Sequence, residues 1–286
     1  MKLDLRTFDV GAKAADPAAY ARLVTERVEE SWDAGADVVV FPEFTWMGLE
    51  RFVAGPEKIR GVAGIFWDEL WPGIAARLAR ADKAVVLGSV PFVDEGGRVR
   101  NRAPILNSGR ELYQDKIHLT PWEGAFSGGG PVRVWNFRGL RVAVVICLDV
   151  EIPEISAALR GMDLDLMLVP SATESLAGVE RVGRCADARA VEIGCHVGLC
   201  HLVGRMDSEL IDENIRRLAV FSPSQRAFPA ADRQAPTAVF ESGFHRLAAT
   251  LDMAALRRCR LDPEETDPSK IRPAPIRVEG SSTRDK

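Results

Sequence analysis

The sequence lacks the features that mark several large classes of protein. It has no run approaching roughly 18 apolar residues, so we expect no membrane-spanning helix. Acidic side chains occur within its first nine residues, where a secretory signal needs an apolar core of roughly 7 to 15 residues, so we expect no signal peptide. It also has no basic excess: 37 Lys and Arg stand against 41 Asp and Glu, a net charge of -4. Nucleic acid is therefore excluded as an expected partner.

Cysteine is scarce as well. The five cysteines are odd in number and lie mostly in apolar or helical surroundings, at positions 147, 185, 195, 200 and 259. This pattern is typical of reduced thiols and favours a cytoplasmic protein. The remaining composition, 47% hydrophobic and 27% charged over 286 residues, is that of a globular protein with a large core.

Neither a low-complexity linker nor a fixed-period repeat interrupts the first 250 residues. We therefore expect one domain over residues 1–260. The stretch 261–286 is rich in proline and charge and cannot build a core by itself. It is expected to be either a frayed tail or an arm that lies on a partner subunit.

Helix-like and strand-like segments alternate along the chain, which predicts a layered α/β fold. The clearest helix is expected over 16–34, with Asp16 as its cap and Pro17 in its first turn. Apolar blocks without alternation predict strands covered on both faces, at 37–41, 84–90, 142–146, 164–169 and 197–203. Further helices are expected at 70–78, 179–193 and 253–260, and further strands at 219–221, 237–240 and 246–251.

The string CHVGLCH, Cys195 to His201, contains residue types that bind zinc. Its apolar flanks indicate a strand, in which residues four apart are separated by about 13 Å and odd and even positions face opposite sides. These side chains cannot close one tetrahedral site. We therefore expect a core strand here and no metal.

Three reactive residue types stand next to strand-like segments. Glu43 follows DVVVFP, Cys147 follows RVAVVI, and Lys116 follows ELYQD. Reactive groups in α/β sheets collect where strands end. A thiolate attacks carbonyl carbon well, an ammonium nearby lowers the thiol pKa and holds an oxyanion, and a carboxylate carries the proton. Taken singly, each residue also has a structural interpretation, because free cysteine is usually buried and strand-end Glu and Lys usually face water.

The segments around these residues resemble the signature regions of a known family. GADVVVFPE, DKIHLTPWE with Phe126 and SGGGP after it, and VAVVICLDVEIPE are similar to the three signatures of the nitrilase superfamily of carbon-nitrogen hydrolases. LDLMLVPSA, DARAVEIGCHV and HRLAATLDMAALRRCR extend the resemblance over most of the chain. The pattern looks like the less characterised branch that carries HLTPWE after the lysine.

The resemblance implies a single-domain α-β-β-α sandwich that assembles as a homodimer or larger homo-oligomer, with no metal or organic cofactor. Cys147 matches the nucleophile, Glu43 the general base and acid, and Lys116 the cation that holds the oxyanion. Glu123 matches a second glutamate that orients the site. The expected activity is hydrolysis of a small amide or carbamoyl compound through a thioester on Cys147, with the backbone N–H of Leu148 as a further oxyanion donor.

Residues after the nucleophile bear on the substrate. True nitrilases usually have Trp and Glu directly after it, whereas Leu148 and Asp149 stand here, so amide chemistry is favoured over nitrile chemistry. Relatives that take carboxylate substrates place arginine three or four positions after the nucleophile, where this chain has Val150 and Glu151. Without a guanidinium to pair a carboxylate, a neutral or cationic amide is favoured. Glu151 also fits a solvent-facing helix N-terminus.

Other residues near the signatures are candidates for the substrate pocket: Trp46, Trp122, Phe126 and Ser171. The three aromatic side chains fit core or dimer packing equally well. Three polar residues are expected to hold the loop and helix around the nucleophile: Asp149, Glu154 and Arg189.

Two alternatives share the same scaffold. An acyltransferase would pass the acyl group from the thioester to an amine or another acceptor in place of water. A catalytically silent binding or regulatory protein would need no reactive thiol. The joint presence of Glu43, Lys116 and Cys147 argues against the silent protein.

Overall fold

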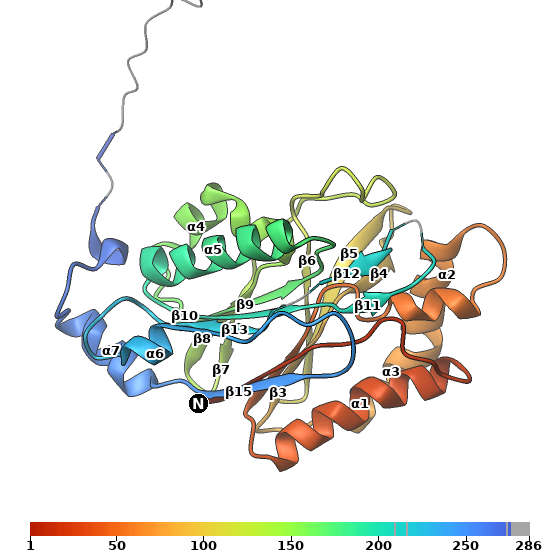
Figure 1. Cartoon of the computed structure of the whole chain (residues 1–286), viewed down its shortest axis with the longest axis horizontal. Coiled ribbons are helices and arrows are strands. Elements are labelled where there is room, and N and C mark those ends of the chain that lie inside the picture. Colours follow the sequence, from red (N-terminus) through yellow and green to blue (C-terminus); the bar gives the residue numbers. More distant parts are fainter. Residues whose placement is uncertain (209, 216, 273, 276–286) are drawn as a thin grey trace, which may run out of the picture.

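The computed structural model describes residues 1–208, 210–215, 217–272 and 274–275. Two β-sheets pack face to face, and helices cover both outer faces, which is the predicted α-β-β-α sandwich (Figure 1). One hydrophobic core joins the inner faces: Leu3 and Val40 come from the first sheet, and Val144 and Leu168 come from the second. In the described ranges, no helix is long and apolar enough to cross a membrane.

The first sheet has the strand order β15-β1-β2-β3-β5-β4, with β6 paired to β5. Strands β1, β2 and β3 are parallel to one another, and the other pairings are antiparallel. The strands are β1 (Lys2–Arg6), β2 (Val38–Phe41), β3 (Ala84–Leu87), β4 (Val90–Val93), β5 (Val99–Asn107), β6 (Arg110–Asp115) and β15 (Arg246–Thr250). Because β2 and β3 are covered on both faces, they are apolar throughout.

The second sheet has the order β14-β13-β10-β9-β8-β7, with β8, β9 and β10 parallel. Its strands are β7 (Val134–Phe137), β8 (Leu140–Val144), β9 (Leu166–Ser171), β10 (His196–His201), β13 (Ala219–Phe221) and β14 (Gln234–Pro236). A separate hairpin joins β11 (Gly204–Arg205) to β12 (Glu213–Asn214). At the middle of β10, a Cβ on Gly198 would lie 2.8 Å from Cδ2 of Leu3, so the two sheets approach most closely where this side chain is absent.

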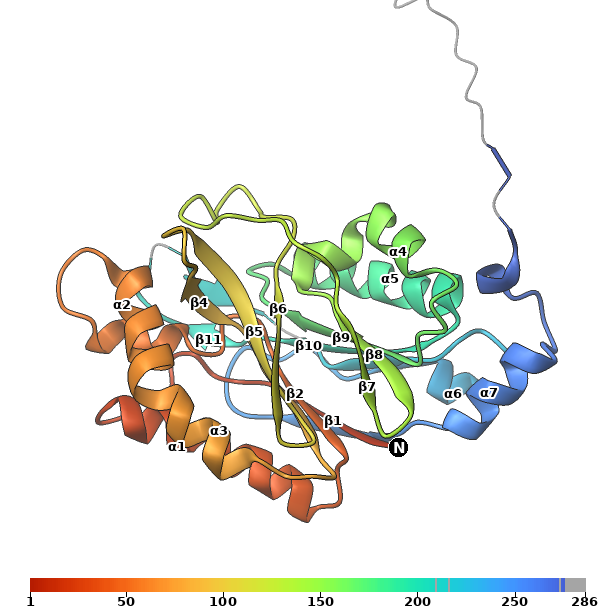
Figure 2. The ribbon, with the colours of Figure 1, turned by 180° about the vertical axis from the view of Figure 1, so that it is seen from behind.

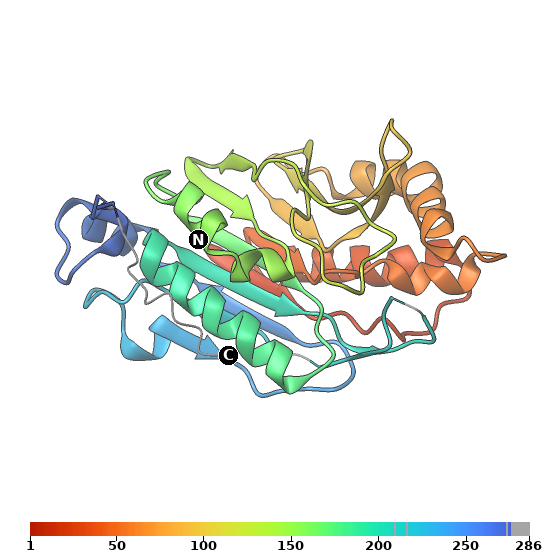
Figure 3. The same cartoon turned by 90° about the horizontal axis from the view of Figure 1, so that it is seen from above.

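Helices α1 (Pro17–Asp33) and α3 (Trp71–Leu78) cover the outer face of the first sheet, and α4 (Pro153–Leu159) and α5 (Leu176–Ile193) cover that of the second (Figures 1 and 3). The Asp16 side chain accepts a hydrogen bond from the N–H of Ala19 and caps α1, as predicted. The shorter elements are the 3-10 turns η1 (Met47–Phe52), η3 (Cys147–Glu151) and η4 (Pro268–Lys270), the π-helical η2 (Ile65–Leu70), and the helices α2 (Lys58–Gly64), α6 (Ala230–Arg233) and α7 (Met253–Leu261).

Two of the predicted strands were wrong in detail. The apolar block 84–90 forms two strands, because Gly88 turns the chain with φ +70°, and a Cβ there would meet the carbonyl oxygen of Pro42 at 2.2 Å. The strand expected at 237–240 lies earlier in the chain, since β14 pairs Gln234–Pro236 with β13. The other predicted helices and strands are found within a few residues of their expected ends.

The zinc-like string is a buried strand, as predicted, because His196–His201 forms β10. Its two histidines bond to Ser222 and to the carbonyl of Arg217. Among the residues that the structure describes, no group of three or more His, Cys, Asp or Glu could hold a metal ion.

The beginning of the expected tail lies against the chain itself. Gln225 donates to the carbonyls of Glu265 and Thr266, and Lys270 lies 3.4 Å from a carboxylate oxygen of Asp163. These contacts join the described start of the stretch to the domain, and both the frayed tail and the inter-subunit arm stay predictions. Residues 273 and 276–286 of the expected tail lie outside the described residues, and the boundary at residue 260 stays a prediction.

Candidate active site

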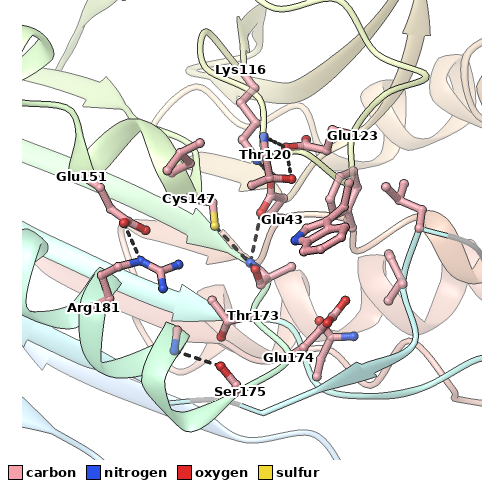
Figure 4. A pocket seen from close by; sticks show the side chains of 18 residues that line it. Glu43, Lys116, Thr120, Glu123, Cys147, Glu151, Thr173, Glu174, Ser175 and Arg181 are labelled. Carbon is pink, nitrogen blue, oxygen red and sulfur yellow. Dashed lines mark hydrogen bonds and ion pairs between the residues drawn. The ribbon is translucent and has the colours of Figure 1, made fainter. Parts of the chain in front are cut away.

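Glu43 lies in the turn after β2 and is almost completely buried. Two side chains fix this turn: Ser89 accepts a hydrogen bond from the N–H of Phe44, and the Thr45 hydroxyl donates to the carbonyl of Pro42. Figure 4 shows the Glu43 carboxylate pointing toward Lys116 and Cys147. The end of a parallel strand therefore presents a fixed carboxylate inside the protein.

Lys116 directly follows β6, and its N–H donates to the carbonyl of Asn101 on β5. The ammonium Nζ lies 2.8 Å from Oε1 of Glu43 and 2.7 Å from Oε2 of Glu123. Burial alone would lower the pKa of Lys116, but Glu43, Cys147 and Glu123 outweigh it and raise this pKa. The ammonium is therefore charged in the resting protein. Two of its three N–H bonds are occupied by carboxylates, which leaves one for another acceptor.

Cys147 stands at the first position of η3, after β8, in a strained backbone conformation. Its φ is +47°, in the left-handed region that costs most residues free energy. The thiol Sγ donates to the carbonyl of Ala172 at 3.5 Å, and the N–H of Ala172 donates to Oε2 of Glu43 at 3.0 Å. The backbone N–H and carbonyl of one residue, Ala172, just after β9, thus bind the carboxylate and the thiol.

The pKa of the Cys147 thiol results from opposing effects. Burial raises this pKa to about 12 and Glu43 adds to the rise, while Lys116 lowers it, as expected. The effect of the ammonium is outweighed, so the thiol is protonated in the resting site. Burial also raises the pKa of Glu43, against the opposing effect of Lys116. A raised carboxylate pKa brings this group closer to the range in which it can both accept and return a proton.

Asn101 and Glu123 complete a buried network that sequence analysis resolved only in part. Asn101 Nδ2 donates to Oε1 of Glu43 at 2.9 Å and to Oε1 of Glu123 at 3.1 Å. Glu123 also accepts bonds from the N–H and the hydroxyl of Thr120. Asn101 was missed because a polar residue inside the strand sequence VRNRAPILN gives no motif by itself.

A cavity of about 320 Å³ lies beside this network (Figure 4). Cys147, Glu43, Lys116 and Glu123 form its inner end, and Leu148 lines it as well. The N–H of Leu148 belongs to the first turn of η3, where backbone N–H groups have no partner within the helix. The other lining residues are Phe44, Thr120, Trp122, Glu151, Ala172, Thr173, Glu174, Ser175, Gly178, Arg181, Leu210, Ile211 and Asn214.

Of the expected pocket residues, Trp122 and Glu151 line this cavity. Trp46 does not: its ring is fully buried and packs on Phe66, and its Nε1 donates to the carbonyl of Leu87. Phe126 lies behind Phe44, with ring centroids 6.0 Å apart. These two aromatic residues belong to the core between the first sheet and its helices, so their assignment to the pocket was wrong.

Ser171 is also outside the cavity lining. It is fully buried at the end of β9, and its hydroxyl acts on the thiol by opposing the rise in the pKa of Cys147. Among the structural partners, Asp149 accepts from the N–H groups of Ile117 and His118, and Arg189 donates to the carbonyl of Val150, as predicted. Glu154 is exposed and was wrongly placed in this group.

Glu151 does not face solvent at a helix N-terminus. Its Oε2 lies 2.6 Å from Nε of Arg181, a residue of α5 that also lines the cavity (Figure 4). The inference that this pocket lacks a guanidinium was therefore wrong. Arg181 comes from a helix 30 positions away, so inspection of the residues after the nucleophile could not reveal it.

A family model described as carbon-nitrogen hydrolase matches residues 5–236. The chain belongs to the carbon-nitrogen hydrolase family. Its sequence is 30% identical to the probable hydrolase YhcX of Bacillus subtilis over 216 residues, which are 73% of this chain and 42% of that one. It is also 30% identical to an (R)-stereoselective amidase of Pseudomonas sp over 236 residues, or 81% of this chain and 83% of that one.

Solved structures show the same fold. XC1258 of Xanthomonas campestris, a CN-hydrolase superfamily protein, superposes with a TM-score of 0.66 at 22% identity, over 91% of this chain and 94% of that one. Nit3 of Saccharomyces cerevisiae, a nitrilase-superfamily member, gives 0.65 at 18% identity, over 93% and 96%. The nitrilase-superfamily resemblance is confirmed, and so is the class of carbon-nitrogen hydrolase of the amidase type. The HLTPWE branch stays a prediction. This carbon-nitrogen hydrolase spans less than half the length of YhcX.

Proposed function

We propose that this carbon-nitrogen hydrolase cleaves the C–N bond of a small non-peptide amide or carbamoyl compound through a thioester on Cys147. The observation that carries the proposal is the meeting of Cys147, Glu43 and Lys116 at the inner end of one cavity. Lys116 is bonded to Glu43 at 2.8 Å, and Glu43 and Cys147 bind the N–H and the carbonyl of the same residue, Ala172. A base, a nucleophile and a fixed cation are the groups that acyl transfer needs.

In the first half-reaction, Glu43 takes the proton from the thiol of Cys147 as sulfur attacks the carbonyl carbon. A thiol with a pKa of about 12 is protonated at neutral pH, so proton removal has to accompany the attack. The carbonyl π electrons move onto oxygen. When the tetrahedral intermediate collapses, the C–N bond breaks, Glu43 gives its proton to the departing amine, and the thioester remains.

The oxyanion of the intermediate is held by the free N–H of Lys116 and by the N–H of Leu148. Both donors are fixed before the substrate arrives, because Lys116 is anchored by two carboxylates and Leu148 by the turn η3. Preorganised donors need no rearrangement as charge develops on oxygen, which is the main source of their effect on the barrier.

In the second half-reaction, Glu43 takes a proton from water, and the hydroxide oxygen attacks the thioester carbonyl. The second intermediate expels the sulfur of Cys147, which regains a proton from Glu43, and the carboxylic acid leaves. Glu123 and Asn101 act as positioning residues, because they bond Lys116 and Glu43 and keep both groups aligned. All of these steps use side chains of this chain.

Charge in the cavity favours a neutral or cationic substrate. Four carboxylates line it, those of Glu43, Glu123, Glu151 and Glu174, against two cations, Lys116 and Arg181. A further anion would meet this excess of negative charge at short range. Names of relatives, such as the (R)-stereoselective amidase and the omega-amidase YafV of Escherichia coli, support amides as the substrate class.

We further propose that the enzyme is a cytoplasmic homo-oligomer. Met162, Leu261 and Ile271 are exposed large apolar side chains. They belong to neighbouring segments, since Lys270 pairs with Asp163 and Arg260 donates to the carbonyl of Asp163. An exposed apolar surface of this kind is typical of subunit contacts. Light scattering after size exclusion measures the mass directly, and a monomer at micromolar concentration would contradict the proposal.

Intact-mass spectrometry tests the thioester. A panel of amides is mixed with the enzyme and quenched in acid, and we expect an added acyl mass on Cys147 together with release of the amine. Cys147→Ser and Glu43→Gln should abolish turnover. Cys185→Ser is the matched control, because Cys185 lies on α5 and does not line the cavity.

Full turnover by Cys147→Ser would overturn the mechanism. Failure of every amide to acylate Cys147 would indicate a silent scaffold. Added hydroxylamine separates the remaining outcomes: a hydrolase releases mainly the acid, whereas an acyltransferase diverts the acyl group to the acceptor in proportion to its concentration.

A further inference from the structure

Trp122 differs from the other tryptophans of this protein in its exposure. Its side chain is 75% exposed, although it stands in the wall of the catalytic cavity. The other five are buried or half-buried: Trp32, Trp46, Trp67, Trp71 and Trp135. An indole left in water exposes a large apolar surface whose burial is strongly favourable, so a ligand that covers Trp122 gains affinity.

Trp122 also borders a second hollow. This outer groove, with a volume of about 770 Å³, lies between α2 and the loop after β6, and its apolar lining includes Ile59, Val99, Pro121 and Ala125. Trp122 and Leu210 line both the outer groove and the catalytic cavity. The two spaces therefore adjoin at these two side chains.

Hydrogen bonds of the neighbouring loop residues fix the backbone at Trp122. Glu123 accepts bonds from the N–H of Thr120 and from Lys116, and the N–H of Glu123 donates to the carbonyl of Thr120. Figure 2 shows this loop between β6 and β7 beside β5, where Ser127 donates to the carbonyl of Val99. The backbone that carries the exposed ring is thus held in place beside the reacting atoms, which preorganises this contact surface.

We propose that the outer groove is an extension of the substrate site, and that the substrate is an elongated amide. Its carbonyl lies at Cys147, an aryl or alkyl arm passes between Trp122 and Leu210, and the end of this arm lies in the outer groove. The proposal rests on the proposed function, because it takes the reacting carbonyl to lie at the thiol.

The charged groups of the groove indicate how the arm ends. Lys58 and Arg60 donate to the carbonyls of Val53 and Gly97, and Glu50 accepts from Ser208, so these groups are engaged within the protein. Glu57 and Asp207 are exposed along the same groove. An arm that is apolar beside Trp122 and polar at its outer end matches this lining.

Binding to the Cys147→Ala variant tests the proposal without turnover. Titration calorimetry compares butyramide, hexanamide and octanamide, and separately N-ethyl-, N-butyl- and N-hexylacetamide, which lengthen the acyl and the amine side. Full burial of one methylene strengthens binding about fourfold. Because the groove is open on one side, we expect at least tenfold tighter binding across four added methylenes in one of the two series.

Two variants test whether the added methylenes bind in the outer groove. Trp122→Ala removes a side chain that lines both spaces, and Ala125→Phe fills the groove. Each should reduce the gain in affinity across four methylenes to less than threefold. Trp67→Phe is the matched control, because Trp67 packs in the core with its Nε1 donating to the carbonyl of Pro91. Trp67→Phe should keep the full gain. Far-UV circular dichroism of each variant shows that it is folded.

The results separate this proposal from the proposed function. If binding strengthens with length but Cys147→Ser keeps full activity, the extended site stands and the thioester mechanism is rejected. No gain with length in either series, or an undiminished gain in Trp122→Ala, would overturn the extended site. A smaller molecular mass of Trp122→Ala in light scattering, with no change in the length dependence, would assign the groove to a second copy of the chain and also overturn the proposal.

Discussion

The ammonium of Lys116 and the carboxylate of Glu43 are 73 positions apart in the chain and 2.8 Å apart in space. Both side chains are 1% exposed. Removing two charges from water is costly unless each is paired, so each group makes the burial of the other tolerable. The site is therefore a unit in which loss of one member exposes the rest to an unbalanced charge.

The first prediction concerns Lys116→Met. Loss of an oxyanion donor typically lowers kcat by about 10² to 10³, and two buried carboxylates lose their counter-ion, which typically costs about 3 to 5 kcal/mol of unfolding free energy. Steady-state kinetics and urea unfolding measure the two effects. Lys83→Met is the control, because Lys83 donates to the carbonyl of Ala36, far from the cavity. Activity within tenfold of wild type would contradict the assigned role.

The second prediction concerns Asn101, whose amide joins two carboxylates. Asn101→Asp places a third carboxyl group against Glu43 and Glu123, so the pKa of the new group should rise above its unfolded value. Stability of the variant should then be closest to wild type in acid and fall as pH rises. Asn101→Ala should lower kcat without this added pH dependence. Thermal unfolding of both variants from pH 4 to 8 provides the comparison, and parallel curves would count against the bridging role.

The third prediction concerns the resting thiol. With a pKa of about 12, Cys147 should react with iodoacetamide about ten times faster for each pH unit between pH 7 and 10. Glu43 raises this pKa, so Glu43→Gln should be alkylated faster than wild type at a given pH while losing amide hydrolysis. Peptide mass mapping follows the rate at each cysteine. Slower alkylation of Glu43→Gln would show that Glu43 deprotonates the thiol before substrate binds.

The fourth prediction concerns Arg181. Arg181→Met frees the carboxylate of Glu151 at the cavity wall and makes the cavity more negative. Because Arg181 is more than half exposed, the effect is modest. We expect the ratio of KM for the cationic 4-aminobutyramide to KM for the anionic succinamate to fall by roughly two- to fivefold at low salt. Arg184→Met, one turn further along α5 and outside the cavity, should leave the ratio unchanged. An unchanged ratio in Arg181→Met would remove Arg181 from substrate selection.

The fifth prediction concerns acid stability. Burial lowers the pKa of His201 from 6.5 to about 4, so the folded protein keeps this ring neutral while the unfolded chain takes up a proton. The unfolding free energy should therefore fall as pH drops from about 6.5 to about 4. His201→Asn keeps a donor for the carbonyl of Arg217 and should reduce this slope by about 1.4 kcal/mol per pH unit. Denaturant titrations at pH 5 and 6, inside this window, measure the slope, and an equal slope in both proteins would show that His201 does not cause the loss of stability in acid.

The layered α/β fold could be predicted from apolar blocks along the chain, whereas the α-β-β-α sandwich was implied by the resemblance to the nitrilase superfamily. Blocks such as Val38–Phe41 are apolar on both faces, a pattern that follows directly from burial between helices and a second sheet. The three candidate catalytic residues were predicted from the resemblance of their flanking segments to the nitrilase signatures, because a place after a strand-like block fits a structural role as well. Arg181 could not be predicted, since its place at the cavity depends on how α5 packs across the second sheet.

The errors have physical causes. Trp46 stands only three residues from Glu43, but the turn after β2 directs its ring into the core, where the carbonyl of Leu87 satisfies its nitrogen. Sequence proximity to a reactive residue does not determine which way a side chain points. Burial and the nearby Glu43 raise the pKa of Cys147 more than the ammonium of Lys116 lowers it, and neither the burial nor the position of Glu43 can be read from the sequence.

Glu43 and Lys116 follow strands of the first sheet, and Cys147 follows a strand of the second. The base and the nucleophile therefore come together only after the two sheets have docked. A chain with one sheet formed has the thiol without the carboxylate beside it, and so cannot carry out the proposed hydrolysis. Turnover thus reports completion of the interface between the sheets.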